Sequence, residues 1–141
     1  MNRRRSVNHE KQQGVMLIEA LIGILIFSIG ILALMGMQAT AMRATIDAKY
    51  RSEAAFLANE IIGTMWVNRA NMSQYATASC ASNTECNAWR TRVQTMLPNA
   101  TGANAPTIVI VGTEATVTVR WQRPGESTVS NHIAVAQINN T

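Results

Sequence analysis

The longest apolar run in the chain begins at Val15 and ends at Met37, and its only charged residue is Glu19. A helix of this length, rising about 1.5 Å per residue, spans roughly 35 Å, enough to cross the hydrocarbon core of a bilayer with some tilt. A carboxylate inside such a helix is costly and marks a functional position. The pattern therefore predicts one membrane-spanning helix over 15–37 with an acidic group near its start.

Beyond this run the hydrophobic pattern changes to that of an amphipathic helix. Residues 38–69 contain no proline, and their apolar positions recur in steps of three and four. We therefore expect the membrane helix to continue to about residue 69 and to pack against the protein's own globular part. Asp47 and Arg51 stand four residues apart, which predicts an ion pair on its surface. The expected apolar stripe comprises Met42, Ile46, Tyr50, Ala54, Leu57, Ile61 and Met65.

The remaining residues, 70–141, have the pattern of a small mixed head. After a polar loop, residues 85–97 predict a short helix with Trp89, Val93, Met96 and Leu97 on one side. Three runs rich in β-branched residues, at 107–111, 115–122 and 128–138, predict antiparallel strands. The fold class is therefore α+β, a long N-terminal helix packed on a small antiparallel sheet. The three tryptophans are expected in packing contacts and not in a ligand cage: Trp66, Trp89 and Trp121.

The chain has two cysteines, Cys80 and Cys86, both in the polar loop. On the outward side of a membrane, two thiols this close together predict a disulfide. A zinc site would need two more ligands, and the histidines, His9 and His132, stand in the leader and in an expected strand. We therefore expect no metal. The spacing is also not the C-x-x-C of redox enzymes, so these cysteines are not expected to be catalytic.

The distribution of charged residues indicates how the chain is oriented in the membrane and does not indicate a binding partner. Four basic residues and one acidic residue among the first 14 account for three of the four net positive charges. This basic leader predicts a cytoplasmic N-terminus and a head on the outward side of the membrane. Because the rest of the chain is nearly neutral, nucleic acid is not expected as a partner. We find no convincing secretory cleavage site after Met37, so the helix should remain in the mature protein.

The leader end Lys11-Gln12-Gln13-Gly14, followed by Val15-Met16-Leu17-Ile18-Glu19, resembles the type III signal of type IV prepilins and pseudopilins. The resemblance implies that prepilin peptidase removes residues 1–14 by cutting after Gly14 and then methylates the amine of Val15. It implies the type IV pilin-like fold, and as partners other minor and major pilins, an inner-membrane pilus assembly platform and membrane lipid. The resemblance also implies that the protein is located first in the inner membrane and then in the pilus, or fimbrium, at the cell surface.

Residues 27–38, FSIGILALMGMQ, further resemble minor pilins of the PilV type, the type IV pilus modification proteins. Two positions depart from the major pilins. Val15 stands where these usually have phenylalanine, and Gly36 where many have a proline that kinks the helix. The second departure points away from a major pilin, whereas neither disturbs the positions that cleavage demands.

Cleavage after Gly14 would create a cation, the amine of Val15, four residues before Glu19. The two could pair within one helix, or the acid of an incoming subunit could meet the amine of an assembled neighbour and set axial register. The alternative is a plain signal-anchor helix in which Glu19 lies near the interface.

No enzyme motif stands out, and no cofactor is implied. The sequence predicts a minor pilin that supports assembly of a type IV pilus, with twitching motility a property of the whole fibre. A minor pseudopilin of a type II secretion system shares the signal and the helix. From another class, the chain could be a membrane-tethered adhesin or DNA-binding module whose helix is only an anchor.

Overall fold

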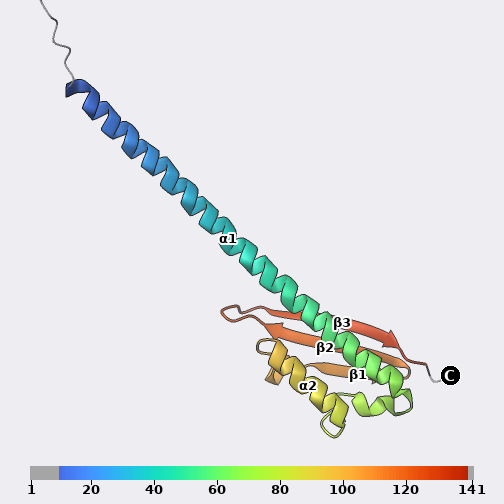
Figure 1. Ribbon diagram of the computed structural model, residues 1–141. Helices are drawn as coiled ribbons and strands as arrows, with labels where there is room; N and C mark the ends of the chain where they lie inside the picture. Colours follow the sequence, from blue (N-terminus) through green and yellow to red (C-terminus); the bar gives the residue numbers. More distant parts are fainter. Residues whose placement is uncertain (1–9, 140–141) are drawn as a thin grey trace, which may run out of the picture. The chain divides into compact units, whose positions relative to one another are not determined.

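The computed structural model describes residues 10–139, so most of the expected leader, residues 1–9, lies outside the described range. The chain divides into two compact units, Met1–Thr45 and Ile46–Thr141. The elements are, in order, α1 (Glu10–Val67), the 3-10 helix η1 (Arg69–Tyr75), α2 (Thr84–Met96), the 3-10 helix η2 (Gly102–Asn104), β1 (Thr107–Val111), β2 (Glu114–Gln122) and β3 (Val129–Gln137). Figure 1 labels the two α-helices and the three strands.

The described part of the first unit is helical throughout and belongs to α1. The helix is long and apolar enough to cross a membrane, with a mean hydropathy of 2.7 in its most apolar window and none of that window buried. Its hydroxyl groups bond to the helix itself: Ser28 Oγ donates to the Ile24 carbonyl at 2.7 Å, and Thr40 Oγ1 to that of Met37 at 2.8 Å. These polar groups are therefore already partnered in an apolar medium.

The second unit is an α+β head. Its sheet has the order β1-β2-β3 with both pairs antiparallel. The last part of α1 and the whole of α2 lie on one side of the sheet (Figure 1). The expected α+β class, the long N-terminal helix and the three antiparallel strands are confirmed.

The core of the head lies between these helices and the sheet. Helix α1 contributes a stripe with the spacing of a helix face, and β2 contributes alternate residues because strand side chains point to opposite faces in turn. Burying large apolar side chains stabilises the fold by about 1.5 to 3 kcal/mol each, before entropy is counted. The main buried side chains are Ala54, Leu57, Ala58, Ile61 and Met65 from α1, Trp89 and Val93 from α2, and Ala115, Val117, Val119 and Trp121 from β2.

The two turns that connect the strands have glycine where the backbone takes a positive φ. Gly112, with a φ of 60°, begins the two-residue hairpin loop between β1 and β2. In Arg123-Pro124-Gly125-Glu126 the glycine has a φ of 82°, and the Glu126 amide donates to the Arg123 carbonyl at 3.1 Å. Proline followed by a glycine at positive φ is the pattern of a type II turn.

Several contacts differ from the sequence predictions. Asp47 pairs with Arg123, whose Nη1 lies 3.1 Å from the Asp47 carboxylate, and not with Arg51. The Arg123 guanidinium also lies 2.7 Å from the Glu126 carboxylate. Arg123 therefore contacts two acids, and its ion pair with Asp47 takes the place of the predicted pair between Asp47 and Arg51. The apolar stripe is buried only from Ala54 onward. The side chains expected to pack that are instead substantially exposed are Met42, Ile46, Trp66 and Met96.

Candidate functional site

The start of the apolar helix carries the residues that the sequence singles out. Val15, Ile18, Glu19 and Ile22 line a hollow on one side of α1, at the spacing of a helix face. The Glu19 carboxylate thus lies among exposed aliphatic side chains. No ion pair between described side chains includes Glu19. In a membrane this carboxylate needs either a proton or a cation from outside the described structure.

Gly14 lies inside α1, four residues after the helix begins. A Cβ added there would meet nothing within 4 Å, and its φ is not in the left-handed region. Because glycine inside a helix costs about 1 kcal/mol relative to alanine, packing and backbone conformation do not account for this residue. Gly23, Gly30 and Gly36 have similarly open surroundings, but they lie within the apolar run, where small residues commonly serve helix packing.

The expected pairing of Glu19 with the Val15 amine cannot form in the uncut chain. The backbone nitrogen of Val15 is a peptide nitrogen within α1, and it becomes a cation only after the bond to Gly14 is cut. The cleavage site, the methylation of Val15 and the role of Glu19 therefore stay predictions.

The predicted disulfide between Cys80 and Cys86 is confirmed, with the two Cα atoms 5.1 Å apart. It joins the loop after η1 to the first turn of α2, and both half-cystines are buried. Asn83 caps this helix, since its side-chain oxygen accepts from the Cys86 amide at 3.0 Å. Closing so short a loop stabilises the head by about 2 kcal/mol in the chain-entropy description.

A polar network beside this disulfide was not predicted from the sequence. Asn68 Nδ2 donates to the Tyr75 hydroxyl and to Glu85 Oε2, at 2.8 Å each, and the Tyr75 hydroxyl donates to Glu85. Burial, followed by the hydrogen bond to the Glu85 carboxylate, raises the pKa of Tyr75. The three side chains join the end of α1, η1 and α2. No local spacing signals a contact between residues so far apart in sequence.

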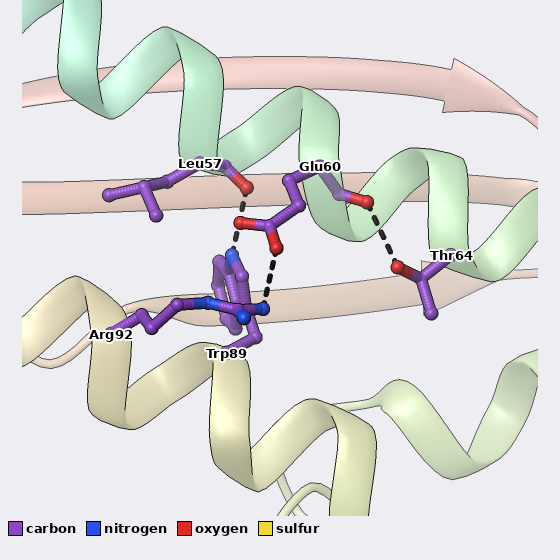
Figure 2. Close-up of polar contacts among 5 residues, drawn as sticks. All are labelled: Leu57, Glu60, Thr64, Trp89 and Arg92. Carbon is purple, nitrogen blue, oxygen red and sulfur yellow. Dashed lines mark hydrogen bonds and ion pairs between the residues drawn. The ribbon is translucent and has the colours of Figure 1, made fainter.

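The contact between α1 and α2 is shown in Figure 2. Trp89 Nε1 donates to the Leu57 carbonyl at 2.8 Å, and Arg92 lies 2.5 Å from the Glu60 carboxylate. Glu60 thus belongs to an ion pair between the two helices. Such a contact orients α2 on α1 and offers no nucleophile with a neighbouring base.

The other acid on this helix, Glu53, lies 3.8 Å from Lys49 and likewise has no arrangement suited to acid–base catalysis. Across residues 10–139 there is no group of three or more His, Cys, Asp or Glu side chains that could hold a metal ion.

An apolar N-terminal helix joined to a small α+β head with an antiparallel sheet is consistent with the type IV pilin fold. Residues 36–97 match a family model described as Tt1218-like, type IV pilin Tt1218. No curated protein and no solved structure gives a significant match to the chain. The family match supports a type IV pilin, and with it membrane anchoring and contact with other pilins.

The match and the signal motif come from different parts of the chain. The motif around Gly14 and Glu19 precedes the matched residues, which cover α1 from residue 36 onward, η1 and α2. The two observations are therefore separate indications of the same class of protein.

Proposed function

We propose that this chain is a minor pilin of a type IV pilus, most like the PilV type. Prepilin peptidase cuts after Gly14 and methylates the new amine of Val15, and the subunit then enters the pilus or its initiation or tip complex. Its cellular route begins in the inner membrane, with the head in the periplasm, and ends in the fibre. Its partners are the peptidase, other minor and major pilins and the assembly platform.

The observation that carries this proposal is the position of Glu19. It lies five residues after Gly14, in a helical segment whose large apolar side chains are exposed. The fold does not account for the glycine or for the acid, whereas processing and assembly require both. The family match over residues 36–97 adds support from a part of the chain that follows the signal motif in sequence. Pilins are structural proteins, in keeping with a chain that is itself not an enzyme.

Charge pairing supplies the mechanism of assembly. The large side chains of 15–37 stay exposed in the single chain, so this helix is suited to packing against lipid first and against other pilin helices later. Glu19 of an incoming subunit meets a Val15 amine of a neighbour, and the pair fixes the axial register of the two helices. Removing one partner of a buried ion pair typically costs about 3 to 5 kcal/mol, because the other charge is left uncompensated.

The test is incorporation into fibres sheared from the surface of the native host. Glu19→Ala should remove the chain from the fibre fraction while leaving it in the membrane fraction. Glu53→Ala is the matched control, since Glu53 lies on the same helix outside the apolar run and its ion pair is long and partly exposed. Equal incorporation of the Glu19 variant and wild type would contradict the proposed pairing.

The same experiment separates the other candidate roles. A membrane-tethered binding module would be absent from fibres, and Glu19→Ala would leave its ligand binding unchanged. A pseudopilin would be absent from surface fibres, and deletion of its gene would block secretion instead. Finding wild type in the membrane alone would therefore overturn the pilus assignment.

A further inference from the structure

The two edges of the sheet in the head differ in whether another part of the chain forms hydrogen bonds to them. At the β1 edge, the Thr77 amide donates to the Ile108 carbonyl at 2.9 Å, and the Ile108 amide donates to Thr77 Oγ1 at 2.7 Å. The loop after η1 therefore caps this edge. At the other edge, no strand within residues 10–139 pairs with the outer side of β3.

The hydrogen-bond pattern shows which backbone groups face outward along β3. The Ile138 amide donates to the Thr113 carbonyl at 2.7 Å, which makes this a hydrogen-bonded pair of the ladder between β2 and β3. Because such pairs alternate in an antiparallel ladder, the even-numbered residues of β3 bond to β2. The amides and carbonyls that point away from β2 then belong to Val129, Asn131, Ile133, Val135 and Gln137.

Strand β3 also lacks the devices that usually protect a sheet edge. It is nine residues long and contains no proline and no Lys, Arg, Asp or Glu. Its register with β2 is unbroken from Val129 to Gln137, so no bulge turns the edge away. Long, uncharged and regular edges of this kind are templates for pairing with another strand.

The side chains of the outward-facing residues are apolar at three positions. Val129, Ile133 and Val135 are 41%, 56% and 58% exposed. They lie on the sheet face opposite the helices, where Ile133 and Val135 stand opposite Thr118 and Thr116 of β2 and Val129 stands opposite Gln122. A strand added to this edge would extend the same face and cover part of these side chains.

We propose that the β3 edge pairs with the β3 edge of a second copy of this chain. The strands run antiparallel about a twofold axis at Ile133, the midpoint of β3, which gives the longest overlap and places Ile133 opposite its copy. The strand suits self-pairing because it contains no Lys, Arg, Asp or Glu and because its histidine, His132, lies opposite Ala134 of the copy, so no like charges meet across the axis. In this register Asn131 lies opposite Val135 and Val129 opposite Gln137, and two three-stranded sheets become one of six.

This pairing does not rest on the role as a pilin, since it uses only the head. A strand edge buries less than the roughly 1,200 to 2,000 Å² of stable protein interfaces, so the pair is weak in dilute solution. The twofold axis is perpendicular to the sheet and therefore reverses the direction of α1, which packs along one sheet face, so anchoring two copies side by side in one membrane does not favour the pair. The contact is therefore best trapped in detergent solution at high protein concentration.

The test is disulfide trapping of the full chain in detergent micelles at high protein concentration. The two native cysteines are closed in the Cys80–Cys86 bridge, so an introduced cysteine is the sole thiol. Directly opposed residues of a hydrogen-bonded pair have Cα atoms about 5.5 Å apart, which a disulfide can span. On oxidation, Ile133→Cys should give several times more covalent dimer than Val109→Cys, an exposed control on β1 whose two copies would be about 24 Å apart across five strand spacings.

Two further measurements keep the proposal open to refutation. Asn131→Cys chains mixed with Val135→Cys chains should form the mixed dimer, which tests the register without changing Ile133. Adding Val135→Lys to Ile133→Cys should abolish trapping, whereas Val111→Lys, a control at an exposed position of β1, should not. Equal trapping at Ile133 and Val109, or trapping that Val135→Lys leaves unchanged, would overturn the proposal.

Discussion

At the scale of single residues, charge in an unfavourable place is the most informative signal in this chain. Glu19 is conspicuous in the sequence because no apolar helix carries a carboxylate without a cost. The Tyr75–Glu85–Asn68 network is the opposite case, since each of its members is unremarkable in sequence. Its meaning depends on a fold that brings positions 68, 75 and 85 together.

The raised pKa of Tyr75 predicts how the stability of the head depends on pH. The folded head holds the phenol proton more tightly than the unfolded chain does, so this group's contribution to stability is complete below its ordinary pKa of 10.0. It is lost as pH rises through the higher folded pKa. We expect Tyr75→Phe to lower the free energy of unfolding by about 1 kcal/mol near pH 8, a difference that shrinks above pH of about 10.

Urea unfolding of the full chain in detergent, followed by tryptophan fluorescence at several pH values, measures this difference. Thr91→Ala is a control, because it removes an exposed hydroxyl bonded to the carbonyl one turn earlier and touches no part of the network. A difference between wild type and Tyr75→Phe that stays constant up to pH of about 11 would show that the phenol proton is not held by the fold.

At the scale of elements, the docking of α2 on α1 depends on packing more than on charge. Trp89 is 1% exposed, whereas the side chains of Arg92 and Glu60 are 54% and 29% exposed. We expect Trp89→Ala to lower the free energy of unfolding by about 3 to 5 kcal/mol, through lost apolar burial and the cavity left behind. Arg92→Ala should cost about 1 kcal/mol or less, because solvent screens exposed ion pairs. Chemical denaturation compares the two variants, and similar losses would contradict this ranking.

The sequence predicts elements better than it predicts contacts between them. The strands can be predicted because the runs 107–111, 115–122 and 128–138 are rich in β-branched residues, which is a local signal. The ion pair of Asp47 with Arg123 could not be found in this way, since helix spacing offers only Arg51 as a partner. The capping of β1 by Thr77 is likewise a long-range contact without a local pattern.

The candidate site likewise has some features that the sequence predicts and others that it does not. Gly14, Val15 and Glu19 could be singled out from the sequence because cleavage signals are short and continuous. The length of the helix that the head covers could not be predicted from the sequence. The apolar stripe from Met42 to Met65 continues without a break, whereas burial begins only at Ala54. A regular stripe fixes which face is apolar and leaves open what covers it.

At the scale of the whole molecule, the chain combines two units with different surroundings. The first presents apolar side chains and Glu19, and so needs lipid or other helices around it. The second has its own core and a disulfide, a bond that is typical of proteins in oxidising compartments. A subunit that is extracted from a membrane into a fibre requires both properties.

The most direct test is the intact mass of the protein extracted from membranes of its native host. The account predicts that the wild-type chain lacks residues 1–14 and carries one added methyl group on Val15. Gly14→Ala should abolish both changes, whereas Gly23→Ala, at a helical glycine with equally open surroundings, should leave both in place. An uncut wild-type chain would contradict the account and leave a signal-anchored head whose role lies in residues 70–141.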